Sequence, residues 1–304
     1  MDIEIWYNNS TIRRMHGMFR SWTKLESGPI TVKHGTPDWN YITNHVHPFS
    51  GGHWYVNELR TIAKINGKYI FLDGTDRPRM CANSHLVPFS LVIKFQFNPS
   101  HGFYAHAASP VVPFTYELSI YDMPFIQELR ELRNEVIRSK KFTTSLYWAG
   151  IFVNHPTRDC IRSLNNTKLG SCKKYSYKEY MRAMATTQVG IAVPGCGDFC
   201  HRDIEQAAIG TPYLRKTFIN ATRNPRLPNV HYYTIEKEGI QFGQLLDHYI
   251  NYFEPNGELR NFTPEEWDMH CEISNNSMKW FDENSSPEGS FKVFCQILEE
   301  NNII

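Results

Sequence analysis

VGIAVPGCGDFCHRDIEQAAIGTP, residues 189–212, is the most informative stretch of this chain. Its apolar start predicts a strand, which stops at a Pro-Gly-x-Gly turn before a helix expected over 200–210. Gly210 and Pro212 predict the end of that helix. A helix that begins directly after a glycine turn exposes unpaired N–H groups at its positive end, and such an end attracts anions. The stretch therefore predicts a binding place for a phosphate or a diphosphate.

Two charged residues of the predicted helix, Arg202 and Glu205, fit a nucleotide. They are three residues apart and therefore share one helix face. Arginine suits phosphate oxygens, while a carboxylate accepts hydrogen bonds from both hydroxyls of a ribose. An ordinary strand-to-helix turn with a surface ion pair has the same spacing, so the residues by themselves leave both interpretations open. A dinucleotide fingerprint needs a third glycine where this chain has Cys200, which disfavours an NAD(P)-dependent oxidoreductase.

Composition limits the class of protein. The 304 residues hold 32 basic and 31 acidic side chains, a net charge of +1, which argues against nucleic acid as the main partner. No run of about 18 apolar residues predicts an integral membrane segment, and the N-terminus lacks the pattern of a secretory signal. Seven scattered cysteines fit free thiols in a reducing compartment. We therefore expect a cytoplasmic protein.

Strand and helix patterns alternate along the chain and predict two α/β halves. In the first half we expect strands over 3–8, 68–74 and 90–98, a helix over 53–66 from its apolar spacing, and an amphipathic helix over 125–141. In the second half we expect strands over 144–153, 189–193, 212–219 and 230–235, and helices over 156–166, 176–187, 200–210, 242–253 and 290–300. Ser176 and Glu179 have the spacing of a capping box.

Residues 180–214, YMRAMATTQVGIAVPGCGDFCHRDIEQAAIGTPYL, resemble the donor-binding region of exostosin-like glycosyltransferases, which have the two-domain GT-B fold. In that family a helix with a tyrosine leads into an apolar strand, a Pro-x-Gly turn, Arg-x-x-Glu-Ala and Gly-x-x-Pro. The matching positions here are Pro194, Gly195, Gly197, Arg202, Glu205, Ala207 or Ala208, Gly210 and Pro212. The resemblance covers about 144–220, and Gln206 departs from the alanine that often follows the acid. The short chain is closer to the small catalytic cores that large DNA viruses of algae encode.

The resemblance implies an α/β fold of GT-B type, in which two Rossmann-like domains face each other across a cleft. Residues 1–142 would then bind the acceptor, and residues 143–275 would bind the nucleotide-sugar donor. Residues 276–304 would return to the first domain as a C-terminal helix. The implied activity is transfer of a sugar, with xylose as the first guess, from a UDP-linked donor to a hydroxyl of a glycan.

The same resemblance assigns the donor site residue by residue. Glu205 would hold the ribose, Arg202 would lie near the diphosphate, and the backbone of Gly195, Cys196 and Gly197 would contact phosphate oxygens. Arg158 is the candidate for a second phosphate contact, with Arg162 as its rival. Enzymes of this fold generally need no bound metal, because a helix dipole and arginines neutralise the leaving diphosphate. We therefore expect no metal and no cofactor besides the donor itself.

An inverting transfer also needs a base for the acceptor hydroxyl. Asp73 and then Asp76 are the candidates, since both follow a predicted buried strand at the edge where α/β sites form. Acids in Asp-Gly and Asp-Arg-Pro also form ordinary turns, and His45, His47 and His53 are rival bases. A retaining mechanism would need no such base. The alternative from another class is a non-catalytic carbohydrate-binding protein on the same fold.

Overall fold

The computed structural model describes residues 3–7, 18–19, 21–25, 30–34, 61–74, 88–100, 102, 104, 107–115, 118, 122–149, 170–171, 175–193, 198–234, 252 and 261–304. The chain divides into two compact units. Unit 1 comprises residues 1–121, 219–225 and 283–304, and unit 2 comprises residues 122–218 and 226–282. The domain boundaries expected from the sequence stay predictions. Among the helices of the described residues, none is both long and apolar enough to cross a membrane.

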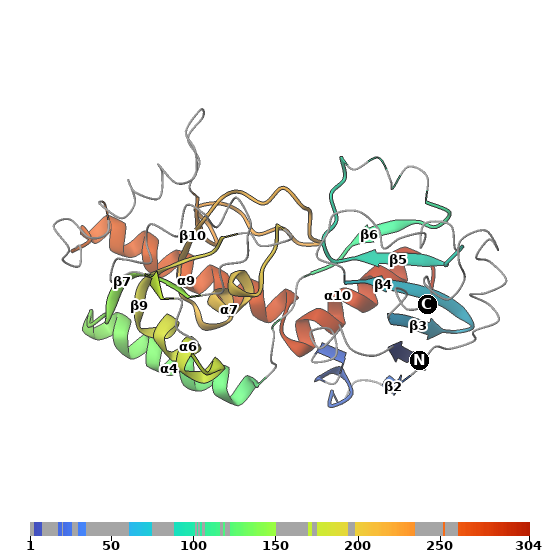
Figure 1. Ribbon diagram of the computed structural model, residues 1–304, viewed down its shortest axis with the longest axis horizontal. Helices are drawn as coiled ribbons and strands as arrows, with labels where there is room; N and C mark the ends of the chain where they lie inside the picture. The colour runs from blue at the N-terminus through green and yellow to red at the C-terminus, as the bar shows by residue number, and fades with distance from the viewer. Residues whose placement is uncertain are drawn as a thin grey trace. The chain divides into compact units, whose positions relative to one another are not determined.

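Unit 1 is built on a six-stranded sheet in the order β2-β1-β3-β4-β5-β6 (Figure 1). Its strands are β1 (Ile3–Tyr7), β2 (Ile30–His34), β3 (Thr61–Ile65), β4 (Lys68–Asp73), β5 (Leu91–Lys94) and β6 (Val111–Pro113). β3 runs antiparallel to β1 and β4, and the other neighbouring strands are parallel. The helix α10 (Pro287–Glu300) belongs to this unit, and its Phe294 meets Phe114 edge to face. The strand patterns at 3–8, 68–74 and 90–98 each contain an observed strand, and the last of these is shorter than expected, because β5 ends at Lys94.

The helix expected over 53–66 is wrong for its described part, because residues 61–65 form the strand β3. Asn66 and Gly67 connect β3 to β4 with φ angles of 49° and 76°, and two successive positive φ angles are what a type I′ hairpin turn requires. An Asn-Gly pair between apolar runs is the strongest short hairpin signal in a sequence. This local turn outweighs the helical spacing of the apolar residues before it. Residues 53–60 lie outside the described part.

Unit 2 contains an all-parallel sheet in the order β11-β10-β9-β7-β8. Its strands are β7 (Thr144–Ala149), β8 (Gly170–Ser171), β9 (Thr187–Ile191), β10 (Tyr213–Arg215) and β11 (Tyr233–Thr234). Its helices are α4 (Met123–Ser139), α6 (Tyr177–Thr186), α7 (His201–Ile209) and most of α9 (Pro264–Asn284). Figure 1 shows α4 and α6 side by side at the base of this unit. Parallel strands connected by helices are the arrangement that the alternating pattern predicts.

Two helix ends in unit 2 follow local sequence signals. Ser176 Oγ accepts a hydrogen bond from Glu179 N at 3.3 Å, and Glu179 Oε2 accepts one from Ser176 N at 2.9 Å, so the predicted capping box is confirmed. Gly210 ends α7 with a φ of 75°, a conformation that favours glycine. The strand patterns at 144–153, 189–193, 212–219 and 230–235 each contain an observed strand.

The helix α9 is an element that the sequence patterns considered above do not predict. Its start nevertheless carries a clear signal, because Thr263 and Glu266 exchange side-chain-to-backbone hydrogen bonds of 2.9 and 3.2 Å. Pro264 at the first helical position strengthens that signal. The helices expected over 156–166 and 242–253 lie outside the described residues.

The strand order of unit 2 reverses direction at one place. The chain passes from β7 to its neighbour β8 on one side, and then returns to β9 on the other side of β7. Open parallel sheets bind ligands outside the carboxyl ends of the strands at such a switch point. Here those ends are Ala149 and Ile191. The segments that follow them carry the predicted phosphate contacts, Arg158 and the turn at 194–197.

A buried arginine connects three elements of unit 2. Arg133 of α4 is fully buried and donates hydrogen bonds to the backbone carbonyls of Thr187 and Gln188, where α6 gives way to β9. Its Nη2 also lies 3.1 Å from His270 Nε2 on α9, and His270 Nδ1 lies 3.0 Å from the Tyr233 hydroxyl. Burial, and then the charge of Arg133, lower the pKa of His270 well below its ordinary value.

We expect the low pKa of His270 to make the protein acid-sensitive. The unfolded chain binds a proton at His270 near pH ~6.5, whereas the folded chain does not, so stability falls as the pH drops below that value. The loss of stability therefore grows as the pH falls from 8 to 5.5. Urea denaturation of the wild type and of His270→Gln over this range measures the effect. The variant should lose less stability than the wild type, and equal losses would contradict the assignment.

Gly190 of β9 leaves room for the side chain of Gln206 on α7. A Cβ at Gly190 would lie 1.7 Å from Gln206 Oε1, and the buried Gln206 amide has no hydrogen-bond partner among the described residues. We expect Gly190→Ala to destabilise the protein by about 1–3 kcal/mol, since overpacking forces a shift. Gln206→Ala should remove the obstacle and rescue Gly190→Ala. A double-mutant cycle by urea denaturation measures this, and additive single effects would refute the contact.

Candidate functional site

The candidate site lies at the start of α7, after β9. Val193 is fully buried, and α7 begins at His201. Asp203 Oδ2 accepts a hydrogen bond from the backbone N–H of Cys200 at 2.8 Å, so one N–H at this helix end is already satisfied. The turn predicted between Val193 and the start of α7, which contains Gly195, Cys196 and Gly197, lies outside the described residues. The phosphate contacts assigned to these three residues therefore stay predictions, as do those of Arg158 and Arg162.

Glu205 is buried on α7 and held by a tyrosine. Its side chain is 4% exposed, and its Oε2 accepts a hydrogen bond of 3.0 Å from the hydroxyl of Tyr180 on α6. Burial, and then the charge of Glu205, raise the pKa of Tyr180 well above its ordinary value. The tyrosine therefore stays protonated and remains a donor at neutral pH. This hydrogen bond orients a carboxylate near the carboxyl end of β9.

Arg202 shares this environment, as its three-residue spacing from Glu205 predicts. The half-buried side chain has a raised pKa: burial lowers the pKa, but four neighbouring groups together outweigh burial, namely Tyr180, Cys200, Glu205 and Asp203. The guanidinium is therefore charged throughout the physiological range. The structure thus brings together the arginine and the acid that the sequence singled out, at the first two turns of α7.

Two more tyrosines surround this pair. The hydroxyls of Tyr147 on β7 and Tyr177 on α6 are buried and have no hydrogen-bond partner among the described residues. Burial raises the pKa of both; Arg202 counteracts that rise at Tyr147, and Glu205 adds to it at Tyr177. The ring centroids of Tyr147 and Tyr180 are 6.3 Å apart. Hydroxyls of this kind are able to donate to or accept from a polar ligand.

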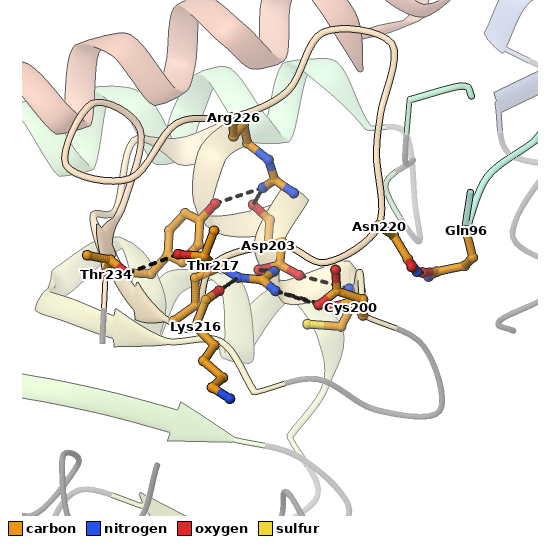
Figure 2. Close-up of polar contacts among 11 residues, drawn as sticks. Gln96, Cys200, Asp203, Lys216, Thr217, Asn220, Arg226 and Thr234 are labelled. Carbon is orange, nitrogen blue, oxygen red and sulfur yellow. Dashed lines mark hydrogen bonds and ion pairs between the residues drawn. The ribbon is translucent and has the colours of Figure 1, made fainter. Parts of the chain in front are cut away.

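A second group of charges lies behind the helix start (Figure 2). Arg215, the last residue of β10, is fully buried and donates from Nη1 to Asp203 Oδ1 at 2.7 Å and from Nη2 to Asp198 Oδ1 at 3.1 Å. Figure 2 also shows Arg226, whose Nη1 donates at 2.8 Å to both the Asp203 carbonyl and the Tyr213 hydroxyl. These arginines hold the segment before α7 and the first turn of the helix itself.

The sequence analysis missed Asp203, Arg215, Arg226 and Tyr180 as individual site residues. The three-residue spacing of Cys200 and Asp203 is a cap-like signal in the sequence. No local pattern marks the two arginines, because their partners lie on other elements. Tyr180 is visible only as the tyrosine of the family pattern.

The candidate bases differ in what the structure describes. Asp73 ends β4 with a fully buried side chain, and its Oδ1 lies 3.2 Å from Nζ of the equally buried Lys94, its partner in the register with β5. Two residues after Lys94, Gln96 Oε1 accepts from Asn220 at 2.8 Å (Figure 2). Asp76, His45, His47 and His53 lie outside the described residues. In the part that the structure describes, no cluster of acids, histidines and cysteines is suited to a metal.

The sequence matches no known family profile and no curated protein. The structure is similar to Anabaena HepE in complex with UDP, with a TM-score of 0.52 and 10% identity over 97% of this chain and 99% of that one. HepE in complex with UDP-glucose gives a TM-score of 0.51 at 10% identity, over 98% and 100%. A glycosyltransferase from Rickettsia africae gives a TM-score of 0.50 at 11% identity, over 96% and 83%. At these identities the likeness concerns the fold, and the expected α/β fold of GT-B type is confirmed.

Proposed function

We propose that this protein is a glycosyltransferase that uses a UDP-linked sugar as its donor. The observation that carries the proposal is the position of Arg202 and Glu205 at the start of α7, beside the switch point of a parallel sheet. Tyr180 orients the Glu205 carboxylate there. Support comes from the similar fold of HepE, which was solved with UDP and with UDP-glucose.

In this proposal the residues of unit 2 bind the donor. One oxygen of Glu205 accepts from Tyr180. In this proposal the same carboxylate accepts hydrogen bonds from the hydroxyls of the ribose. Arg202, the N–H groups of Gly195, Cys196 and Gly197, and Arg158 bind the diphosphate. Their positive charge and the helix dipole stabilise the negative charge that develops as the diphosphate leaves, so no metal is required.

The proposed reaction forms one bond and breaks another. The acceptor oxygen forms a bond to the anomeric carbon, the bond from that carbon to the diphosphate oxygen breaks, and UDP leaves with the electron pair. A base, for which Asp73 and Asp76 are the candidates, takes the proton of the acceptor hydroxyl. On sequence grounds, we also propose that the acceptor is a glycan and that the transferred sugar is small and neutral, such as xylose. The proposal further includes a cytoplasmic location, a relationship to exostosin-like enzymes and a viral source.

UDP should stabilise the wild type against heat, by about 2.7 kcal/mol at a hundredfold excess over Kd. We expect Glu205→Ala to abolish this stabilisation because the ribose loses its acceptor. Tyr180→Phe should weaken UDP binding by about tenfold, since the carboxylate loses a charge-assisted hydrogen bond. A thermal-shift titration measures both, with Glu131→Gln on the exposed face of α4 as the matched control. Stabilisation by NAD(P) but not by UDP would contradict the proposal.

The two candidate bases should respond differently to substitution. We expect Asp76→Asn to lower kcat by about 10²–10⁴ with UDP binding unchanged, because the acceptor proton loses its base. Asp73→Asn should instead destabilise unit 1 by about 3–5 kcal/mol, because it removes the carboxylate that faces buried Lys94. UDP release from UDP-glucose and UDP-xylose with sugar acceptors, together with thermal melts, measures both effects. A fully active Asp76→Asn would exclude Asp76 as the base, and a fully stable, inactive Asp73→Asn would restore Asp73 to that role.

A further inference from the structure

We propose that Arg215 is a positioning residue for the donor diphosphate. It holds Asp198 and Asp203 together and so fixes the segment that connects the turn at 194–197 to α7. This inference rests on the proposed function, and it adds a residue that the family pattern does not include. Arg215 itself is fully buried, so it acts through the segment and not by touching the donor.

Arg215 donates from both of its terminal guanidinium nitrogens to this segment. Nη1 donates to Asp203 Oδ1 at 2.7 Å, while Nη2 donates to Asp198 Oδ1 at 3.1 Å and to the Asp198 carbonyl at 3.4 Å. Nε donates to the carbonyl of Lys216 at 2.5 Å, which ties the same side chain to the end of β10. A planar fork with several donors is required to reach both acids at once, and a lysine lacks that geometry.

The two acids lie on either side of the helix start, Asp198 before α7 and Asp203 within it. Asp198 directly follows the turn at 194–197, and Asp203 lies in the first turn of α7. The second oxygen of Asp203 accepts from Cys200 N at 2.8 Å, so this acid connects Arg215 to the backbone at the helix start. With both acids attached to one guanidinium, the position of residues 198–203, and with it the direction of the N–H groups at the start of α7, depends on Arg215.

Aromatic contacts keep the guanidinium in place. Its Cζ lies 3.2 Å from the ring centroid of Phe218, and Cζ of Arg226 lies 4.5 Å from the same centroid. Arg226 in turn donates to the Asp203 carbonyl and to Tyr213. The stacking restricts the rotamers of Arg215, so its two acids are held in one arrangement before any ligand arrives.

Asp198→Asn separates positioning from simple electrostatics. The substitution weakens one contact of Arg215 and leaves the buried pair with Asp203 intact, so the protein should fold. If Asp198 acted only as a nearby negative charge, its removal would strengthen the binding of UDP. Positioning predicts the opposite: the Kd for UDP and the KM for UDP-glucose should rise about three- to tenfold, with the ligand-free Tm nearly unchanged.

The experiment measures UDP binding by calorimetry in the wild type, Asp198→Asn, Arg215→Lys and the double variant. Asp282→Asn, which removes the carboxylate of an exposed pair with Arg130 in the same unit, is the matched control and should bind UDP like the wild type. The double variant should bind no more weakly than Arg215→Lys, because both substitutions release the same segment. Equal or tighter UDP binding by Asp198→Asn would overturn the positioning role. A wild type that does not bind UDP would instead refute the proposed function and the inference that rests on it.

Discussion

Asp203 places a carboxylate in the interior of unit 2, where an unpaired charge costs several kcal/mol. Three groups converge on this residue: the guanidinium of Arg215 and the N–H of Cys200 on its carboxylate oxygens, and Arg226 on its carbonyl. Because each contact comes from a different part of the chain, the start of α7 has one position relative to β10 and to the segment before it. The rest of the candidate site depends on this arrangement, since Arg202 and Glu205 project from the same helix.

The burial of α7 restricts where chemistry is possible. Every residue from Asp203 to Ile209 is buried, Glu205 among them, and in α7 only His201 and Arg202 are partly exposed. A buried carboxylate such as Glu205 needs a fixed partner, and Tyr180 provides one. The helix is thus a structural element along most of its length and a candidate binding element only at its N-terminal end.

This protein shares its fold with the similar solved structures but very little of their sequence. Identity to HepE and to the Rickettsia glycosyltransferase is 10–11%, yet the folds align over nearly the whole chain. A parallel sheet with connecting helices requires apolar strands and amphipathic helices, and many sequences satisfy that requirement. The residues of the proposed donor site are few, so the proposal depends on Arg202 and Glu205 more than on the core around them.

The sequence by itself determined the elements whose signals are local. These are the helix expected over 125–141, which is observed as α4, the capping box of Ser176 and the glycine that ends α7. Each depends on hydrogen bonds or apolar spacing within a few residues. The spacing of Arg202 and Glu205 is local in the same sense. The strand β3 and the helix α9 were missed although the Asn66–Gly67 turn and the Thr263 cap are local signals as well.

Only the tertiary structure decided that Arg215 meets Asp198, that Lys94 faces Asp73 and that Arg133 lies beside His270. Such pairs form between elements that come together when the sheets assemble, and no periodicity in the sequence records which buried charge will face which.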